Sequence, residues 1–489
     1  MIKPGLSRRA PPKPPPGRDD GEAETSSRAV LLWLLPAIGW YAVLLTAGGS
    51  FGLFSPLAHG LTFNSMLLHL LDGRFDVDPA AIGHEGYLRD GAVYAYFGIL
   101  PALLRTPFLL LPDFATADFT RLSCLVAVSL MALFKVLTAR MVWRTVTAQG
   151  TAVLLRFLVL ALLFGGPQIQ FLRPSIFMES VLWAGAFAAA FVFLVLRGWT
   201  REAGFTAGLM SAASLVCGLC LLTRVSTGLG LYAALGLIWL WHLVSEIRRT
   251  GPRRLSRQLS ALVSPMLVLL AFAALTAFVN QERWGSPLVF VDLSRALILQ
   301  HFPERLQRLR QYGEFNPIRL GFGLVYYFLP VWVWRDGSGQ LLWSDFVERT
   351  IDMAELPPSS FFVSDPLIIG LAVLGLFGLV RREVPRRAPI TLAAVGLAVP
   401  ALLMLLALSY TFRYRIEFYP LLELCGFVGF WHLLMRRPRH IEALLGGGAA
   451  ASVLAAHALW LLNAMSPLGP ANRVLGPSGI LEFYGSVFH

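Results

Sequence analysis

The chain has 489 residues, 56% of them hydrophobic, and a mean hydropathy of +0.63. This composition is too apolar for a soluble globular protein and indicates a polytopic membrane protein. The formal net charge of +12 does not point to nucleic acid binding, because the basic residues lie in short clusters between apolar runs, as they do in cytoplasmic loops.

The chain begins with a tail, residues 1–28, that is rich in Pro, Ser and charged residues and is predicted to be disordered. The first apolar run, about residues 29–48, is long enough to cross a membrane. Basic residues precede it, and because such residues stay in the cytoplasm, the amino terminus is predicted to be cytoplasmic. The next loop, residues 49–118, is therefore expected on the extracytoplasmic side.

Within that loop, the stretch 61–112 combines two apolar segments with several charged residues. A helical spacing of apolar residues predicts an amphipathic helix that lies at the membrane surface and ends at Gly73; its apolar face holds Phe63, Met66, Leu67, Leu70 and Leu71. The second segment, 94–112, is interrupted by glycine and proline. Because a lipid-exposed backbone must satisfy its own hydrogen bonds, we interpret this segment as interfacial or re-entrant.

The later apolar runs alternate with basic clusters, of which the segment 248–257 is the strongest cytoplasmic marker. A second long extracytoplasmic loop is predicted at 280–365, and its apolar piece, 320–333, is interpreted as embedded but not spanning. These spans are predicted at about 122–139, 151–166, 181–196, 204–222, 226–243, 262–279, 366–380, 390–408, 418–434 and 441–462. The sequence thus predicts an all-α polytopic domain, residues 29–464, with about eleven spans, and an extracytoplasmic tail, 465–489.

Acidic residues gather in the first extracytoplasmic loop. Asp72 and Asp90 each precede a glycine, as solvated turn residues commonly do. Three others lie between the two membrane-embedded segments and are candidates for a catalytic base: Asp76, Asp78 and Glu85. We rank Asp76 and Asp78 first because they follow the amphipathic helix most closely. Glu417 and Glu423 are the next candidates, and Glu423 has a competing structural interpretation as an ion-pair partner of Arg413 or Arg415.

No metal site is predicted. His84 lies beside Glu85 but without the HxH or HExxH spacing of metal ligands, so a surface position is favoured. The four cysteines lie within apolar runs, where a thiol is usually a small core residue. Cys217 and Cys220 form a CxxC pair that lacks a second pair of ligands.

Several predicted extracytoplasmic turns carry arginines that could bind a phosphate at the depth of the lipid headgroups: Arg173, Arg224, Arg283, Arg413 and Arg415. The alternative is that each arginine simply marks the end of a span and reaches toward water. We favour that alternative for any single arginine, but phosphate binding for Arg413 and Arg415 together.

Four segments resemble a known family, the GT-C fold glycosyltransferases that use a polyprenyl-phosphate sugar, such as protein mannosyltransferases and the lipid A aminoarabinose transferase. VNQERWGSPLVF, at 279–290, and FRYRIEFYPLLEL, at 412–424, are the most specific. The run FTRLSCLVAVSLMALFKVLTARMVWR, at 119–144, is similar to that family's second span. DGAVYAYFGILPALLRTPF, at 90–108, is similar to its re-entrant piece.

The resemblance implies a GT-C-like fold and an inverting transfer of a hexosyl or pentosyl unit to a hydroxyl of a lipid, glycan or protein. The implied place is the outer face of a bacterial inner membrane, with membrane lipids as surroundings and no nucleic acid partner. It implies no cofactor, with a divalent cation left open. The family's catalytic acid commonly begins the first interfacial helix, where this chain reads SPLAHGLTFNSM, without an acid. Either Asp76, Asp78 or Glu85 takes that role, or the chain keeps the fold and uses it differently.

Two other functions remain as alternatives. A transporter or a flippase of lipid-linked glycans is expected to have related halves and charged, discontinuous helices near the bilayer midplane. The sequence has no visible repeat, and its spans are nearly uncharged at their centres. An inert scaffold of an envelope complex would leave the clustered charges unexplained.

Overall fold

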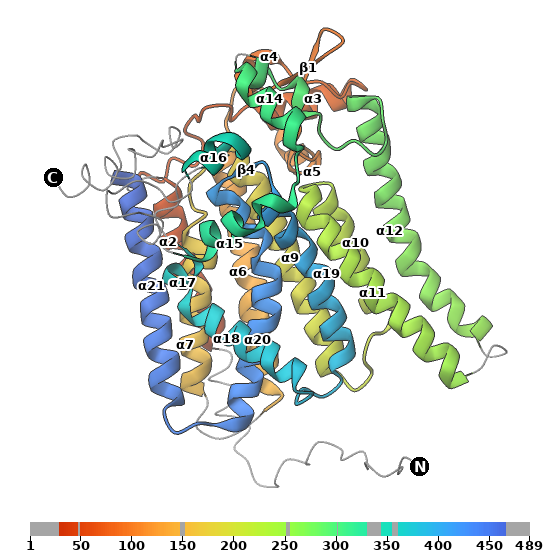
Figure 1. The fold of residues 1–489 in the computed structure, drawn as a ribbon, viewed down its shortest axis with the longest axis vertical. Helices are drawn as coiled ribbons and strands as arrows, with labels where there is room; N and C mark the ends of the chain where they lie inside the picture. The colour runs from red at the N-terminus through yellow and green to blue at the C-terminus, as the bar shows by residue number, and fades with distance from the viewer. Residues whose placement is uncertain are drawn as a thin grey trace.

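The computed structural model describes residues 29–46, 49–146, 152–250, 255–300, 302–329, 344–354 and 360–465. Figure 1 shows long helices side by side in a bundle, with short helices and strands at one end. We call that end, which carries α3, α4, β1 and α14, the loop face. The predicted tail 1–28, the predicted tail 465–489 apart from Met465, and Arg253 and Arg254 of the basic loop lie outside the described residues.

The bundle confirms the predicted all-α polytopic class. Seven described helices are long and apolar enough to cross a membrane, and three further bundle helices, α2, α10 and α18, are shorter but apolar. The count of about eleven spans stays a prediction. The bundle helices are α2 (Leu34–Leu45), α6 (Thr120–Arg144), α7 (Ala152–Phe164), α8 (Gly166–Ile169), α9 (Ile176–Thr200), α10 (Ala207–Leu221), α11 (Val225–Thr250), α12 (Leu255–Trp284), α18 (Pro366–Val380), α19 (Arg387–Leu406), α20 (Tyr419–Arg436) and α21 (Ile441–Met465).

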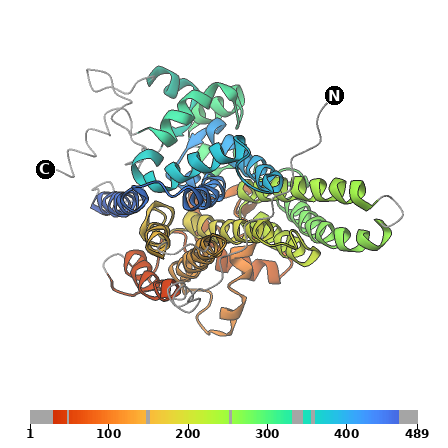
Figure 2. The same cartoon turned by 90° about the horizontal axis from the view of Figure 1, so that it is seen from below.

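Small residues allow the helices to approach closely. Where α18 crosses α20, a Cβ atom added at Gly375 would lie 1.9 Å from the carbonyl oxygen of Cys425, and one added at Gly429 would lie 1.9 Å from that of Leu371. Backbone contact of this kind is how helices associate in lipid, where burial of apolar surface gives little driving force. Figure 2, seen along the bundle, shows α11 and α12 projecting from one side, with α12 packed against α10.

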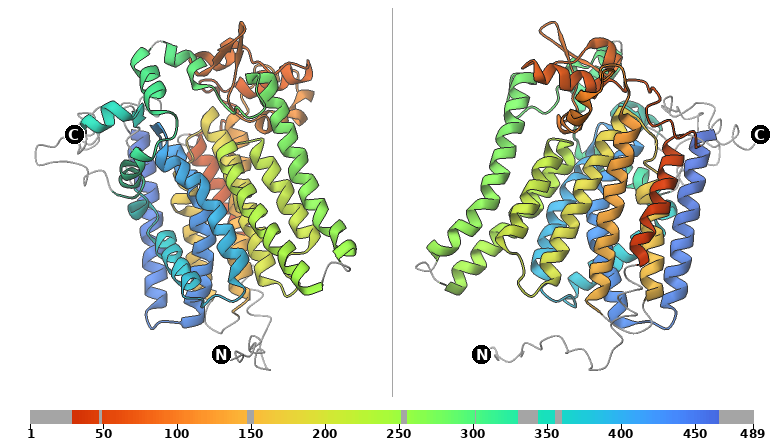
Figure 3. Two further views of the ribbon diagram at one scale, coloured as in Figure 1. Left: turned by 45° about the vertical axis from the view of Figure 1, so that its right-hand side comes forward. Right: turned by 180° about the vertical axis from the view of Figure 1, so that it is seen from behind.

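The loop face is built from parts of two segments that are distant in sequence, and both views of Figure 3 show these parts at the same end of the bundle. The short helices at residues 320–328 and 361–364 of the second segment lie lower, beside the bundle helices (Figure 1). The first contains α3 (Thr62–Leu71), α4 (Pro79–Ile82), η1 (Gly83–Glu85), β1 (Tyr87–Arg89), β2 (Ala92–Tyr94), α5 (Leu100–Leu103) and η2 (Thr106–Leu110). The second contains η3 (Leu293–Arg295), α13 (Leu297–Gln300), α14 (Pro303–Tyr312), η4 (Pro317–Arg319), α15 (Leu320–Phe328), α16 (Ser344–Thr350), β3 (Met353–Ala354) and α17 (Phe361–Ser364).

These two segments contact one another and the bundle. The strands β1 and β2 form an antiparallel hairpin in which Tyr87 is opposite Tyr94. β3 pairs in parallel with β4 (Ser409–Tyr410). The short helix η6 (Phe412–Glu417) follows β4 and leads directly into α20. The second loop is thus attached to the chain just before η6.

The predicted amphipathic helix is present as α3, and Gly73 follows it with a left-handed φ of 74°. Its apolar side packs against protein: Phe63, Met66 and Leu67 are fully buried in a cluster with Phe97 and Phe119. The interrupted segment 94–112 forms only α5 and η2, of four and five residues, which are too short to cross a bilayer. The nine-residue α15 is also too short to span.

A buried ion pair fixes the first loop to the bundle. Arg105, 1% exposed, places its Nη2 atom 2.6 Å from Glu179 Oε2 on α9. The same guanidinium donates to the carbonyl of Gly60 and to the side chains of Asn64 and Thr120. Because leaving one of these groups unpaired would be costly, the loop has a fixed position over the bundle.

Candidate active site on the loop face

The three candidate acids lie in different surroundings. Asp76 is 3.1 Å from His69 Nδ1 and 3.3 Å from Arg74 Nη1. Asp78 caps α4, since its Oδ1 accepts the backbone N–H of Ala80 at 2.9 Å. Both carboxylates therefore have partners within their own stretch of the loop.

Glu85 instead acts electrostatically on two tyrosines, Tyr87 and Tyr96. Burial raises the pKa of Tyr96 to about 12; Arg413 opposes this rise, whereas Glu85 adds to it. Arg224 also acts on the Tyr96 hydroxyl. Burial likewise raises the pKa of Tyr87; Glu85 adds to this rise and Arg413 opposes it. Glu85 of the first loop thus acts on the same tyrosine as two arginines, Arg224 just before α11 and Arg413 on η6.

Tyr414 brings those two arginines together. The guanidinium carbon of Arg224 is 5.6 Å from the centre of the Tyr414 ring, and that of Arg413 is 5.5 Å from it. Arg413 also lies 4.3 Å from the centre of the Phe177 ring. Aromatic contacts of this type hold a guanidinium in place.

Glu417 sets the direction of Arg224. Its buried carboxylate accepts from Arg224 Nε at 2.5 Å, from Ser226 Oγ at 2.6 Å and from Thr227 Oγ1 at 2.7 Å. The contact between the two side chains is through Nε of the guanidinium. The sequence kept Glu417 as a reserve catalytic acid, and the structure places it as the partner of an arginine.

The other candidate arginines are held more deeply. Arg415, 1% exposed, is 3.1 Å from Asp365 and donates to Gln170 and Ser364. Arg283, 3% exposed, donates to the Phe97 carbonyl at 2.7 Å. Arg173 lies 4.5 Å from the centre of the Phe412 ring. Arg415 and Arg283 are therefore enclosed by protein groups, whereas Arg224 and Arg413 are half-buried.

Sequence reasoning missed Arg305 on α14. It makes a two-point contact with Asp352, at 2.7 and 2.8 Å, and these hydrogen bonds raise its pKa, with Glu85 among the smaller contributors. The second loop thus adds a cation near the same acid. The basic segment PERLQRLRQY was the available signal.

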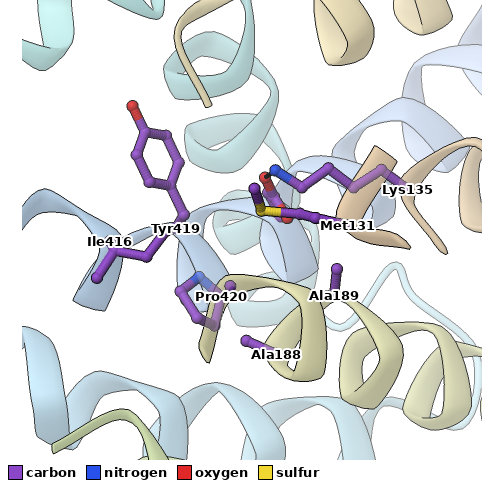
Figure 4. A pocket seen from close by; sticks show the side chains of 9 residues that line it. Met131, Lys135, Ala188, Ala189, Ile416, Tyr419 and Pro420 are labelled. Atoms are coloured by element: carbon purple, nitrogen blue, oxygen red, sulfur yellow. Dashed lines mark ion pairs between the residues drawn. The ribbon is translucent and has the colours of Figure 1, made fainter. Parts of the chain in front are cut away.

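The partner of Glu423 was also missed. The structure pairs Glu423 with Lys135 of α6, Nζ to Oε1 2.6 Å, and not with Arg413 or Arg415 as the sequence considered. Both side chains are at most 3% exposed. Figure 4 shows Lys135 beside Met131, Tyr419 and Pro420 in a small cavity. Lys135 is the sole lysine of the described residues, in a chain that otherwise uses arginine, and this was the signal that could have found it.

The arrangement can accept a proton at Glu85 and hold an anion at Arg413 and Arg224. Within the described ranges, no group of three or more His, Cys, Asp or Glu side chains is arranged to hold a metal ion. All four cysteines are buried and free.

No protein-family model and no curated protein matches the sequence. Among solved structures, archaeal oligosaccharyltransferase AglB from Archaeoglobus fulgidus, in complex with an inhibitory peptide and a dolichol-phosphate, is similar at 15% identity and a TM-score of 0.49. The same organism's enzyme in complex with Zn and sulfate is similar at 13% identity and a TM-score of 0.47. The matches cover 90% and 87% of this chain but 56% and 52% of those chains, so this chain spans about half their length.

Proposed function

We propose that the chain is a membrane glycosyltransferase that moves a sugar from a polyprenyl-phosphate donor to an acceptor hydroxyl. The observation that supports this most is that Arg413 and Arg224 lie at the same Tyr414 ring, 5.5 and 5.6 Å from its centre, while Glu85 and both arginines act electrostatically on Tyr96. A base and two cations at one end of an apolar bundle suit a reaction between a water-exposed acceptor and a lipid-anchored phosphate.

In this proposal Glu85 is the base. Its carboxylate takes the proton of the acceptor hydroxyl while the acceptor oxygen attacks the anomeric carbon and the bond to the phosphate oxygen breaks. Attack opposite the leaving phosphate inverts the anomeric configuration. Glu85 stands ahead of Asp76 and Asp78 because it acts on Tyr96 together with Arg413 and Arg224, whereas Asp76 pairs with His69 and Arg74, and Asp78 caps α4.

Arg413 and Arg224 contact the donor phosphate, where negative charge grows as the bond breaks. Each charge-assisted contact contributes on the order of 1.5–3 kcal/mol. Arg173 lies at the Phe412 ring next to Arg413's helix and is a further candidate. Arg415 and Arg283 act indirectly, since both are enclosed and hold η6 and the first loop in place.

The loop face is the extracytoplasmic face of a bacterial inner membrane in this proposal. The basic clusters between spans support that orientation. The donor then lies with its chain in the bilayer and its sugar at the loop face, and the acceptor, a lipid, glycan or protein, arrives from the aqueous side. A divalent cation could assist the phosphate, although the proposal gives it no residues.

The decisive experiment measures sugar transfer by the purified full-length protein in lipid vesicles from a panel of synthetic polyprenyl-phosphate sugars. Glu85→Gln is expected to lower kcat by about 10²-fold to 10⁴-fold, because the amide keeps the shape but cannot accept the proton. Asp76→Asn, which removes a comparable loop carboxylate, is the matched control and should retain most of the activity. Full activity of Glu85→Gln would remove Glu85 from the reaction, and loss in Asp76→Asn alone would assign the base to Asp76.

A further inference from the structure

The loop face carries two pairs of a histidine and a carboxylate. One is His69 with Asp76, at 3.1 Å. The other is His84 with Glu85, where Nε2 and Oε1 are 3.5 Å apart. The second pair has a third member, His59, whose ring lies edge-on to that of His84 with a distance of 5.3 Å between ring centres. Two histidines therefore lie next to the carboxylate that we propose as the base.

The backbone is specialised to bring His59 to this position. His59 has a left-handed φ of 60°, which is uncommon for a residue other than glycine. Its ring lies against Gly83, where an added Cβ would be 2.8 Å from His59 Cε1 and where φ is 58°. The Thr62 hydroxyl contacts both the His59 and the Ala81 carbonyls. Strained conformations that neighbours enforce in this way cluster at functional sites.

The electrostatics keep His59 uncharged near neutral pH. Burial lowers the pKa of His59, the neighbouring His84 lowers it further, and Glu85 opposes them. Glu85 in turn acts electrostatically on Tyr87, Tyr96 and Arg305, and Arg413 acts on the same two tyrosines from η6. His84 is 62% exposed, so the outer end of the cluster reaches water.

We propose that His84, positioned by the ring of His59, is a proton relay that returns Glu85 to its ionised form after each transfer. This inference rests on the proposed function. The acceptor proton moves to the Glu85 carboxylate, then to His84 Nε2, and from His84 to water; the electron pair of the broken O–H bond forms the new glycosidic bond, and the phosphate leaves with the pair of the broken C–O bond. Glu85 is the catalytic residue, His84 is the relay residue, and neutral His59 positions the ring of His84 without adding a competing charge.

The first test uses chemical rescue of transfer in vesicles with the same polyprenyl-phosphate sugars. His84→Ala is expected to lower kcat about tenfold with KM unchanged, and imidazole in the buffer should restore the rate because the position is exposed. His69→Ala, the matched histidine beside Asp76, should leave kcat unchanged and show no response to imidazole. Equal effects of the two alanine variants, or no rescue, would overturn the relay.

The second test needs no activity. In protein with isotope-labelled histidine, Glu85→Gln should lower the pKa of His59 and His84→Ala should raise it, while the His69 resonance serves as a reference. An unchanged His59 titration in both variants would refute the cluster. A parent protein that titrates as expected but transfers no sugar would refute the proposed function and, with it, the relay. A parent that transfers sugar with His84→Ala unimpaired would refute the relay alone.

Discussion

Replacing one member of the Lys135–Glu423 pair should be far more harmful than replacing both. The two charges are 2.6 Å apart, which at an effective dielectric constant of about 20 gives a gross attraction of roughly 6 kcal/mol. Most of this attraction offsets the cost of removing both ions from water. Lys135→Met leaves a buried carboxylate without its partner and should cost about 3–5 kcal/mol, whereas Lys135→Met with Glu423→Leu should be nearly neutral or stabilising.

Thermal unfolding of the four proteins of this double-mutant cycle, in one detergent and at one protein concentration, measures the coupling. The matched control is the pair Arg436 and Glu383, 2.7 Å apart, in which Arg436 is 56% exposed and for which we expect a coupling of at most about 1 kcal/mol. If the double variant at 135 and 423 were as unstable as the sum of the single variants, the two charges would not depend on one another, and the reasoning would fail.

Two further predictions concern the donor site and the orientation. Arg413→Lys should raise the donor KM about tenfold, because a lysine loses the planar two-point contact worth roughly 1.5 kcal/mol or more; an unchanged KM would place the phosphate elsewhere. Cysteines introduced at Asp72 and Arg437, near opposite ends of the bundle, should react differently with an impermeant thiol reagent in intact cells, since the native cysteines are buried. Labelling at position 437 and not at 72 would invert the proposed topology.

Much of the fold could be predicted because a helix that crosses a membrane requires a continuous apolar run, which is visible directly in the sequence. The apolar runs, the proline interruptions of 94–112 and the glycine after α3 all act within a few residues, so their effects appear where the sequence places them. The amphipathic pattern of α3 predicted the helix correctly but did not predict what its apolar side would contact. Periodicity reports which side is apolar, whereas contact with Phe97 and Phe119 depends on how the loop folds back.

The candidate site was predicted as a set of residues but not as an arrangement. Proximity to the amphipathic helix favoured Asp76 and Asp78. Glu85 instead ends η1, and Tyr87 of the hairpin that follows is acted on by both Glu85 and Arg413, an arrangement that the spacing of residues does not reveal. Burial also could not be predicted for individual arginines. Arg413 and Arg415 are two residues apart on η6, yet Arg415 is enclosed by Asp365, Gln170 and Ser364 while Arg413 lies against aromatic rings.

The ion pair within the bundle also has a consequence for how the protein is made. Lys135 is synthesised about 290 residues before Glu423, which at roughly 5–20 residues per second is a delay of about 15–60 seconds. During that time α6 enters the membrane with a lysine whose partner does not yet exist, at an insertion cost of about 2.5–3.5 kcal/mol. The favourable insertion free energy of the other, apolar residues of α6 must offset this cost, or the helix must stay beside the insertion machinery until α20 is synthesised. Truncated chains that end before α20 should therefore hold α6 less firmly in the membrane than the full chain does.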